Sequence, residues 1–330
     1  MNIPTHSGMM VGATGAASGK FTDPDRTLSG EKRASVALKQ LETLWINTGS
    51  LCNITCANCY IESSPGNDRL AYISAAEAHS FFIEARAAGA REIGFTGGEP
   101  FLNPEFADML ADALAMDFAA LVLTNAMQPM LRPAIKERLL KLNTRYGNRL
   151  TLRVSLDHYA QDLHEKERGE RTWDKTLEGI DWLVANGFQV TIAGRTCWGE
   201  TEPEARAGYA ALYHAQNWPI DAGDPMQTVL FPEMDGRADV PEITIGCWSL
   251  LGKSPDAMMC ATSRMVVKRK GAAHPTVLPC TLLPYEPGFE MGTTLTAARH
   301  ADGGMFAQGA VKLCHPHCAK FCVLGGGACS

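Results

Sequence analysis

The residues best suited to chemistry are the three cysteines of "GSLCNITCANCY", which follow an apolar run typical of a strand: Cys52, Cys56 and Cys59. The sequence shows no secretory signal, so its eleven cysteines are expected to be reduced thiols in the cytoplasm. Metal ligation therefore explains the clustered cysteines better than a disulfide framework does. The isolated Cys197 is interpreted as a buried apolar residue.

A second group of cysteines lies in the last third of the chain. Cys260 and Cys280 flank two strand-like runs, 264–269 and 275–279, which a Gly-containing turn joins. Beyond them cysteines recur every four residues, and Pro316 with a run of glycines favours a looped cage over a helix. We predict a second metal region whose ligands come from six late cysteines: Cys260, Cys280, Cys314, Cys318, Cys322 and Cys329.

Apolar strand-like runs alternate with amphipathic helical patterns through the middle of the chain. The predicted strands are 43–49, 92–98, 119–125, 150–157, 188–194 and 226–232. Six strands with helices between them indicate parallel β/α units. The predicted fold class is α/β, a partial (β/α)6 TIM-like barrel with a small cysteine-rich C-terminal extension. A doubly wound open sheet is the second choice, because periodicity does not reveal strand order.

Capping residues also mark the starts of two predicted helices. Ser74 and Glu77 predict a capping box at the start of the first helix. Asn103 and Pro104 are expected to open the second helix as its cap and first residue.

We divide the chain into three parts: a flexible tail rich in Gly and Ala at 1–36, a barrel at 37–240 and a cysteine-rich domain at 241–330.

Composition excludes some classes of partner. The formal net charge is −6 and no long Lys/Arg run occurs, so a nucleic-acid partner is not expected. No stretch of about 18 to 20 consecutive apolar residues occurs, so no membrane span is expected. The sequence predicts a cytoplasmic protein without nucleic-acid or membrane partners.

The first three thiols come directly after a strand, at the edge where β/α barrels carry their active sites. Three thiolates from one loop can hold three irons of a [4Fe–4S] cluster and leave the fourth iron open to a cofactor or substrate. A zinc ion with a fourth ligand from elsewhere is the alternative at this point.

Four segments together resemble the motifs of the radical S-adenosylmethionine (SAM) enzymes. The spacing Cys-x3-Cys-x2-Cys followed by Tyr60 is similar to the cluster motif of that family, and "FTGGEP" is similar to its glycine-rich segment. The runs "LTNAM" and "VSLDHYAQDLHEKERG" resemble its third-strand and fourth-strand segments. His158 departs from the pattern, since many relatives have Gly there, and it is interpreted as narrowing the pocket or reaching the substrate.

The resemblance implies a role for each matching residue. The three clustered cysteines hold the SAM-binding cluster, and the methionine part of SAM chelates its open iron. Gly97 and Gly98 permit a close approach of backbone to SAM, and Glu99 supplies a carboxylate for its ammonium group. Ser155 is expected to contact the ribose, and Arg195 to pair with the methionine carboxylate. The implied cofactor-binding residues are Tyr60, Gly97, Gly98, Glu99, Asn125, Ser155 and Arg195.

The cysteine-rich end resembles the SPASM and twitch extensions of this family, which hold auxiliary [4Fe–4S] clusters. One auxiliary cluster with four thiolates is the first interpretation. Two clusters, one with an open site or with His315 or His317 as a ligand, are the second. A zinc site is the third, because Cys and His together also suit that ion.

The family resemblance also predicts a function. The enzyme cleaves SAM reductively to a 5′-deoxyadenosyl radical, which abstracts a hydrogen atom from a peptide or small molecule during an oxidative modification such as dehydrogenation or cross-linking. An electron donor such as flavodoxin or ferredoxin is then required. Two alternatives are a non-catalytic iron–sulfur electron carrier and a zinc-stabilised binding module, but neither explains the Gly-Gly-Glu-Pro segment.

Overall fold

The computed structural model describes residues 19–232 and 239–325 of the 330-residue chain. Cys329, one of the predicted metal ligands, lies outside the described residues. Among the helices that are described, none combines the length and apolar composition required to cross a bilayer.

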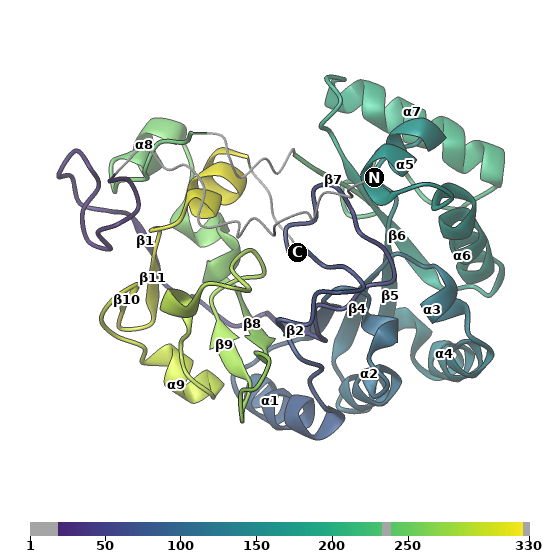
Figure 1. The fold of residues 1–330 in the computed structure, drawn as a ribbon, viewed down its shortest axis with the longest axis horizontal. Coiled ribbons are helices and arrows are strands. Elements are labelled where there is room, and N and C mark those ends of the chain that lie inside the picture. The colour runs from purple at the N-terminus through teal and green to yellow at the C-terminus, as the bar shows by residue number, and fades with distance from the viewer. Residues whose placement is uncertain (1–18, 233–238, 326–330) are drawn as a thin grey trace, which may run out of the picture.

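An eight-stranded sheet forms the centre of the molecule (Figure 1). Its strands are β2 (Thr43–Asn47), β3 (Glu92–Thr96), β4 (Ala119–Thr124), β5 (Leu150–Ser155), β6 (Gln189–Arg195), β7 (Thr228–Phe231), β8 (Ser263–Val267) and β9 (Thr276–Leu278). The strand order is β7-β6-β5-β4-β3-β2-β8-β9, and every neighbouring pair is parallel except β8 and β9. Because β2 to β7 lie beside one another in chain order, the partial barrel is confirmed and the doubly wound alternative is wrong.

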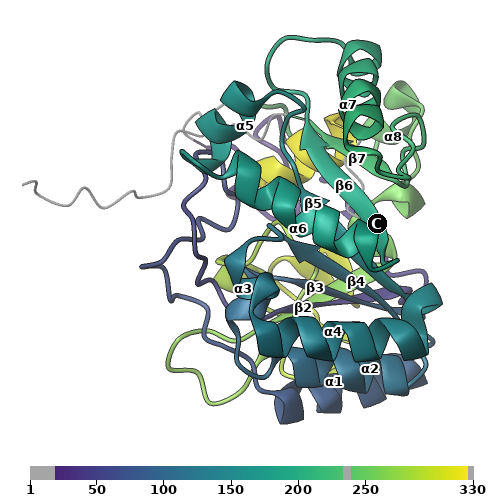
Figure 2. The same cartoon turned by 90° about the vertical axis from the view of Figure 1, so that its right-hand side faces the viewer.

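The longer helices cover the outer face of this sheet, as Figure 2 shows for α1, α2, α4 and α6. The helices are α1 (Ala75–Ala87), α2 (Phe106–Ala115), α3 (Gln128–Leu131), α4 (Pro133–Tyr146), α5 (Gln161–Arg168), α6 (Trp173–Ala185), α7 (Glu202–Gln216), α8 (Cys247–Leu251) and α9 (Leu295–Arg299). Apolar side chains at helical spacing fill the layer between helices and sheet, including Phe82, Phe95 and Phe106, whose rings meet edge to face.

One of the two predicted helix starts is confirmed. Ser74 and Glu77 form the expected reciprocal capping box of α1. The second prediction is wrong, because α2 begins at Phe106 and not at Pro104. The Asn103 side chain accepts a hydrogen bond from the backbone amide of Glu105 (2.9 Å) and donates to the carbonyl oxygens of Thr48 (3.0 Å) and Ile73 (2.9 Å). Its amide therefore joins the loop after β2 to the segment before α1.

The C-terminal region is continuous with the barrel sheet. The predicted hairpin is confirmed as the antiparallel pair β8 and β9, and β8 also pairs in parallel with β2, which the sequence did not predict. Cys318 and Cys322 do not lie in a looped cage as expected, since Cys318–Leu324 forms a π-helix. The wider turn of a π-helix, with its i→i+5 bonding, brings residues four or five apart to one side.

Residues 19–36 are packed against the C-terminal region, so the expected flexible tail is wrong for this stretch. Strand β1 (Ser35–Val36) pairs with β11 (Ala310–Lys312), which in turn pairs with β10 (Phe306–Ala307). The guanidinium of Arg33 forms a 2.5 Å ion pair with Glu242, and both side chains are almost completely buried. Glu242 also accepts hydrogen bonds from the backbone amides of Phe21 and Leu28.

The Glu242→Gln variant tests whether this N-terminal stretch is part of the cooperative fold. The change leaves a buried guanidinium without a carboxylate, so we expect it to lower the free energy of unfolding by about 3 kcal/mol in urea denaturation. Glu137→Gln is the control, because it removes only the exposed pair with Lys141 and should cost less than about 1 kcal/mol. Equal effects of the two variants would mean that residues 19–36 do not contribute to stability.

Candidate active site

The carboxyl ends of the barrel strands surround an open cavity of about 1340 Å³. Each of β2 to β7 contributes at least one residue to its lining, among them Trp45, Thr96, Thr124, Ser155, Ala193 and Phe231. Thr281, Leu282 and Phe321 of the C-terminal region also line it. The cavity is therefore enclosed by the barrel and the extension together, at the edge of the sheet where the sequence places the active site.

Nine of the ten residues predicted to hold the first cluster and SAM line this one cavity. They are Cys52, Cys56, Cys59, Tyr60, Gly97, Gly98, Asn125, Ser155 and Arg195. They come from five separate segments of the chain, which the parallel sheet brings to a single edge. The tenth, Glu99, lies beneath the lining.

The loop that carries the first three cysteines is fixed from several sides. Gly98 and Glu99 donate backbone hydrogen bonds to the carbonyl oxygens of Gly49 (2.8 Å) and Leu51 (3.0 Å). A Cβ atom on Gly98 would stand 2.0 Å from the Leu51 oxygen, so no other residue fits there. The second glycine is thus required for packing between the two loops, in addition to any approach to a ligand.

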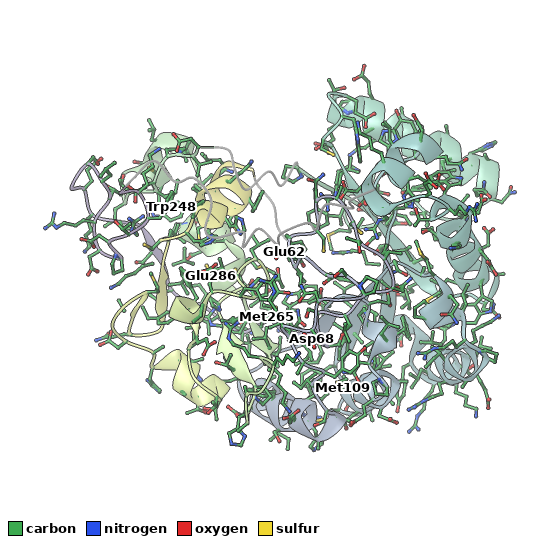
Figure 3. The ribbon with its side chains drawn as sticks, in the orientation of Figure 1. Glu62, Asp68, Met109, Trp248, Met265 and Glu286 are labelled. Atoms are coloured by element: carbon green, nitrogen blue, oxygen red, sulfur yellow. The ribbon has the colours of Figure 1, made fainter. Side chains whose placement is uncertain are left out.

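The C-terminal region holds the far side of the same loop through Tyr285. Its hydroxyl donates to the carbonyl oxygen of Ile61 (2.7 Å) and accepts from the Asn67 amide (3.1 Å). The guanidinium of Arg69 stacks over its ring at 3.7 Å. Asp68 of this loop, labelled in Figure 3, forms an ion pair with Lys270 of the extension, which adds a second contact between the two regions.

The three thiols share the cavity but do not converge on a single point. Across the described residues, no three Cys, His, Asp or Glu side chains are arranged to hold one metal ion. A [4Fe–4S] cluster does not require such convergence, because each thiolate binds a different iron, whereas a zinc site does. Burial raises the pKa of Cys52 to about 12 and that of Cys56 to about 11, so ligation must displace their protons.

Glu99 is 2% exposed and its carboxylate already has three donors. It accepts hydrogen bonds from the Thr124 hydroxyl (2.9 Å), the Asn125 amide (2.9 Å) and the Phe101 amide (3.3 Å). Burial outweighs these bonds and raises the pKa of Glu99 to about 7. The carboxylate therefore joins β4 to the loop after β3, and its predicted contact with an ammonium group stays a prediction.

A network of buried charges that the sequence did not single out ties the cysteine loop to β5 and β6. Asp157 pairs with Arg168 (2.7 Å) and with Arg195 (3.4 Å). Glu167 accepts hydrogen bonds from the backbone amide (2.9 Å) and side-chain amide (2.8 Å) of Asn58, which lies between Cys56 and Cys59. Glu167 and Arg168 belong to the charged run "HEKERG", but only the fold shows that their side chains point toward the protein interior.

Charge pairing with Asp157 favours the ionised form of Arg168. Burial works against the charged form of Arg168, but the Asp157 carboxylate outweighs it and raises the pKa of the guanidinium. Arg195 also donates to the carbonyl oxygen of Asn58 (3.1 Å). Its Nη1 is buried and has no hydrogen-bond partner within the described residues, so a donor on the cavity lining is left for a ligand.

His158 is absent from the cavity lining, contrary to the interpretation that it narrows the pocket or reaches the substrate. Its Nε2 lies 2.9 Å from Glu200, and its ring packs against Tyr159 and Trp198. The histidine therefore connects β5 to the loop after β6, outside the cavity.

Five of the six late cysteines form a second group. Cys318 has four cysteines as electrostatic neighbours, which are Cys260, Cys280, Cys314 and Cys322. Four of the five are buried and Cys322 is half-buried. The ends of the β8–β9 hairpin bring Cys260 and Cys280 together, and the π-helix supplies Cys318 and Cys322. The sixth, Cys329, lies outside the described residues.

Comparison with known proteins agrees with this arrangement. The family model of the radical SAM superfamily matches residues 46–206, which contain the first three cysteines and the cavity-lining ends of β2 to β6. This part of the chain, just under half of its length, is similar to the radical SAM superfamily. Its radical SAM motifs lie where the sequence resemblance places them, at the carboxyl ends of the strands.

Three relatives show how far the likeness extends. The antilisterial bacteriocin subtilosin biosynthesis protein AlbA of Bacillus subtilis (strain 168) is 28% identical over 144 residues, 43% of this chain and 30% of that protein. SuiB of Streptococcus suis, solved with its precursor peptide SuiA, has a TM-score of 0.57 at 14% identity, over 78% of this chain and 63% of that one. The structure of anSMEcpe with bound AdoMet has a TM-score of 0.56 at 15% identity, over 79% and 80%.

The two structural likenesses show a shared fold, and they extend past the barrel into the cysteine-rich region. This chain spans less than half the length of the curated relatives it matches. The cofactors of radical SAM proteins, a [4Fe–4S] cluster and SAM, fit the residues of the cavity. Three thiols on one loop suit three irons, and the unpartnered Nη1 of Arg195 suits a carboxylate.

The raised pKa of Glu99 predicts a pH dependence of stability. The folded protein holds a proton up to about pH 7 that the unfolded chain releases near 4.5, so this group favours folding most at low pH. Between these values the free energy of unfolding should fall with rising pH by up to about 1.4 kcal/mol per unit, and Glu99→Gln should remove this slope.

Urea denaturation of wild type and Glu99→Gln at several pH values between 4.5 and 7 measures the slope. Glu178→Gln, a change at an exposed position on α6, should keep the wild-type slope. If Glu99→Gln keeps it too, the carboxylate does not titrate in this range.

The contacts of Glu167 predict a positioning role for this residue. Glu167→Ala removes both hydrogen bonds to Asn58 and the ion pair of Glu167 with Arg195. The loop that carries Cys56 and Cys59 therefore loses its fixed shape. We expect a chelator to remove iron from this site roughly tenfold faster than from wild type. The exposed Glu170→Ala is the matched control and should retain iron as wild type does. Identical rates in all three proteins would contradict the positioning role.

Proposed function

We propose that this protein is a radical SAM enzyme that modifies a peptide oxidatively. The observation that carries the proposal is the single cavity that gathers nine of the ten predicted cluster and SAM residues. When bound, the cluster and SAM supply a 5′-deoxyadenosyl radical that abstracts a hydrogen atom from the substrate. The contribution of the chain is to bind and orient SAM and substrate and to exclude other hydrogen donors.

The polar residues of the cavity suit the groups of SAM. Arg195 offers a buried guanidinium nitrogen to the methionine carboxylate, and its other contacts to Asp157 and Asn58 hold the side chain in place. Ser155 offers a hydroxyl to the ribose from the end of the neighbouring strand. Both roles are supported by the position of these side chains on the cavity lining. Ser155 ends β5 and Arg195 ends β6, and these two strands pair directly.

Apolar side chains form much of the remaining lining. Leu123 and Ala193 come from the barrel strands, Phe231 from the end of β7, and Leu282 and Phe321 from the extension. Such walls exclude water and stray hydrogen donors from a reactive radical, which is the protein's main task in this chemistry. The extension is therefore part of the active cavity as well as a site for metal.

We further propose that residues 241–330 act as a domain that holds one auxiliary [4Fe–4S] cluster, beside a barrel domain at 37–240. Four of the six late cysteines ligate the cluster, and the close grouping of five of them supports this. Burial raises the pKa of Cys260 to about 11 and raises the pKa of Cys318 well above its ordinary value, so these thiols become negative only on ligation. Held by these cysteines, such a cluster would supply a one-electron acceptor for an oxidative outcome.

A peptide is the proposed substrate, and a small molecule is the alternative. AlbA is named as a biosynthesis protein of a bacteriocin, and SuiB was solved with a precursor peptide. The cavity is open to solvent, so a segment of a peptide can approach it from outside. We infer that the reaction takes place in the cytoplasm with flavodoxin or ferredoxin as the electron donor.

The Cys52/Cys56/Cys59→Ala triple variant tests this function. After anaerobic reconstitution we expect about eight irons per chain in wild type and about four in the variant. Reductive cleavage of SAM to 5′-deoxyadenosine should be abolished in the variant. Cys197→Ala is the control, because this cysteine belongs to neither group, and it should retain both iron and cleavage.

Each alternative function predicts a different result. Cleavage of SAM by the triple variant would show that the active cluster lies elsewhere. Eight irons in wild type without any cleavage would indicate an electron carrier. Zinc in place of iron, in a colourless protein, would indicate a binding module.

A further inference from the structure

Arg264 on β8 is a buried cation whose partners are all uncharged. The side chain is 2% exposed and is among the largest fully buried side chains of the protein. It donates hydrogen bonds to the carbonyl oxygens of Cys260 (2.7 Å), Ser263 (2.8 Å) and Gly309 (3.5 Å). In the described parts of the chain no carboxylate pairs with it.

This state is unusual for a buried arginine and also costly. The free-energy cost of removing a guanidinium from water is offset only when a negative group lies near it. The buried Arg33 pairs with Glu242, and the largely buried Arg168 pairs with Asp157. Carbonyl dipoles satisfy hydrogen bonds of Arg264 but carry no net charge that could balance its own.

The electrostatic neighbours of Arg264 are the side chains of Cys260 and Cys280. These residues stand at the two ends of the β8–β9 hairpin and are among the proposed ligands of the auxiliary cluster. A thiol is neutral, whereas a metal-bound thiolate is negative, so this pair becomes a source of countercharge only on ligation. The guanidinium also bonds the backbone of Cys260 itself.

We propose that Arg264 is the buried counter-ion of the auxiliary iron–sulfur cluster, and that it stabilises the assembled cluster and raises its reduction potential. The inference rests on the proposed function, since it requires a cluster in the extension. The net charge and surroundings of a cluster set its potential, and a cation nearby favours the more negative, reduced state. Arg264 is thus a positioning and tuning residue that acts through the cluster.

A second cavity offers the competing explanation. Arg264 also lines an open cavity with Lys39, Arg299 and His300, and no Asp or Glu is among its lining residues. A free anion bound there could balance the same charge. Lys39 is exposed and already paired with Asp256 at 3.0 Å, and the hydrogen bonds of Arg264 go to carbonyl groups beside the thiols. These observations favour the cluster over a free anion.

The test uses the full-length Cys52/Cys56/Cys59→Ala protein, in which the auxiliary cluster is the only one expected. Arg264→Met removes the charge and Arg264→Lys keeps it. Arg299→Met, on the exposed rim of the second cavity, is the matched control. The thermal midpoint is measured before and after anaerobic reconstitution, and the midpoint potential of the cluster by redox titration with electron paramagnetic resonance.

The expected result is a coupling between the charge and the cluster. Reconstitution should raise the thermal midpoint less in Arg264→Met than in the parent, and the potential should shift to more negative values. Arg264→Lys and Arg299→Met should keep both values close to those of the parent. A merely structural role would lower the midpoint of Arg264→Met equally with and without iron, and would leave the potential unchanged.

Other outcomes separate the two levels of the proposal. Normal iron content with no shift in either quantity would overturn the role of Arg264 and leave the proposed function intact. No uptake of iron by the late cysteines would overturn both the counter-ion and the auxiliary half of the function. If inorganic phosphate stabilises the iron-free parent but not Arg264→Met, the countercharge is a free anion and the inference is wrong.

Discussion

The active cavity depends on the buried charges that hold the cysteine loop against β5 and β6. A loop with three thiols has few backbone bonds of its own, yet its sulfur atoms must stay at fixed positions to hold a cluster. Glu167 fixes the segment between two of the cysteines through Asn58, while Asp157 holds the two arginines beside it. In a water-poor interior these contacts are strong only because every charge in the group has a partner of opposite sign.

Packing of backbone against backbone completes the restraint from the other side. Gly98 lies so close to Leu51 that no side chain fits between the two loops, and the bond from Glu99 to Leu51 continues that contact. Tyr285 then joins the loop to the extension. Since β8 pairs with β2, the strand that precedes the cysteine loop, the extension adds β8 and β9 to the same sheet. Barrel and extension therefore enclose the cavity as one unit.

Periodicity and spacing predicted the features that depend on local sequence. The six barrel strands, the capping box of α1 and the cysteine hairpin all follow from residues that are close together in the chain. The features that were missed depend on contacts between distant residues. The pair of Arg33 with Glu242 spans 209 positions, and without it the stretch 19–36 shows only a composition poor in periodic apolar residues.

Two further features were missed for a similar reason. The pairing of β8 with β2 cannot be read from either strand, because both are apolar and each would suit several neighbours. The motif predicts a ligand contact for Glu99, which stays a prediction, but it does not reveal the burial and the three donors that surround the carboxylate. A motif identifies the residue type that a site requires, whereas the direction of its side chain depends on the packing around it.

The two thiol groups differ in the charge that surrounds them, and this difference gives the proposed reaction a direction. Arg168 lies near Cys52 and Cys56, but its charge is balanced by Asp157. Arg264 lies near Cys260 and has no carboxylate among the described residues. With the proposed ligands, a cluster in the extension therefore lies beside an unbalanced cation, which favours its reduced state, and one in the barrel does not. An electron released by the substrate would thus be held more firmly in the extension, as an oxidative modification requires.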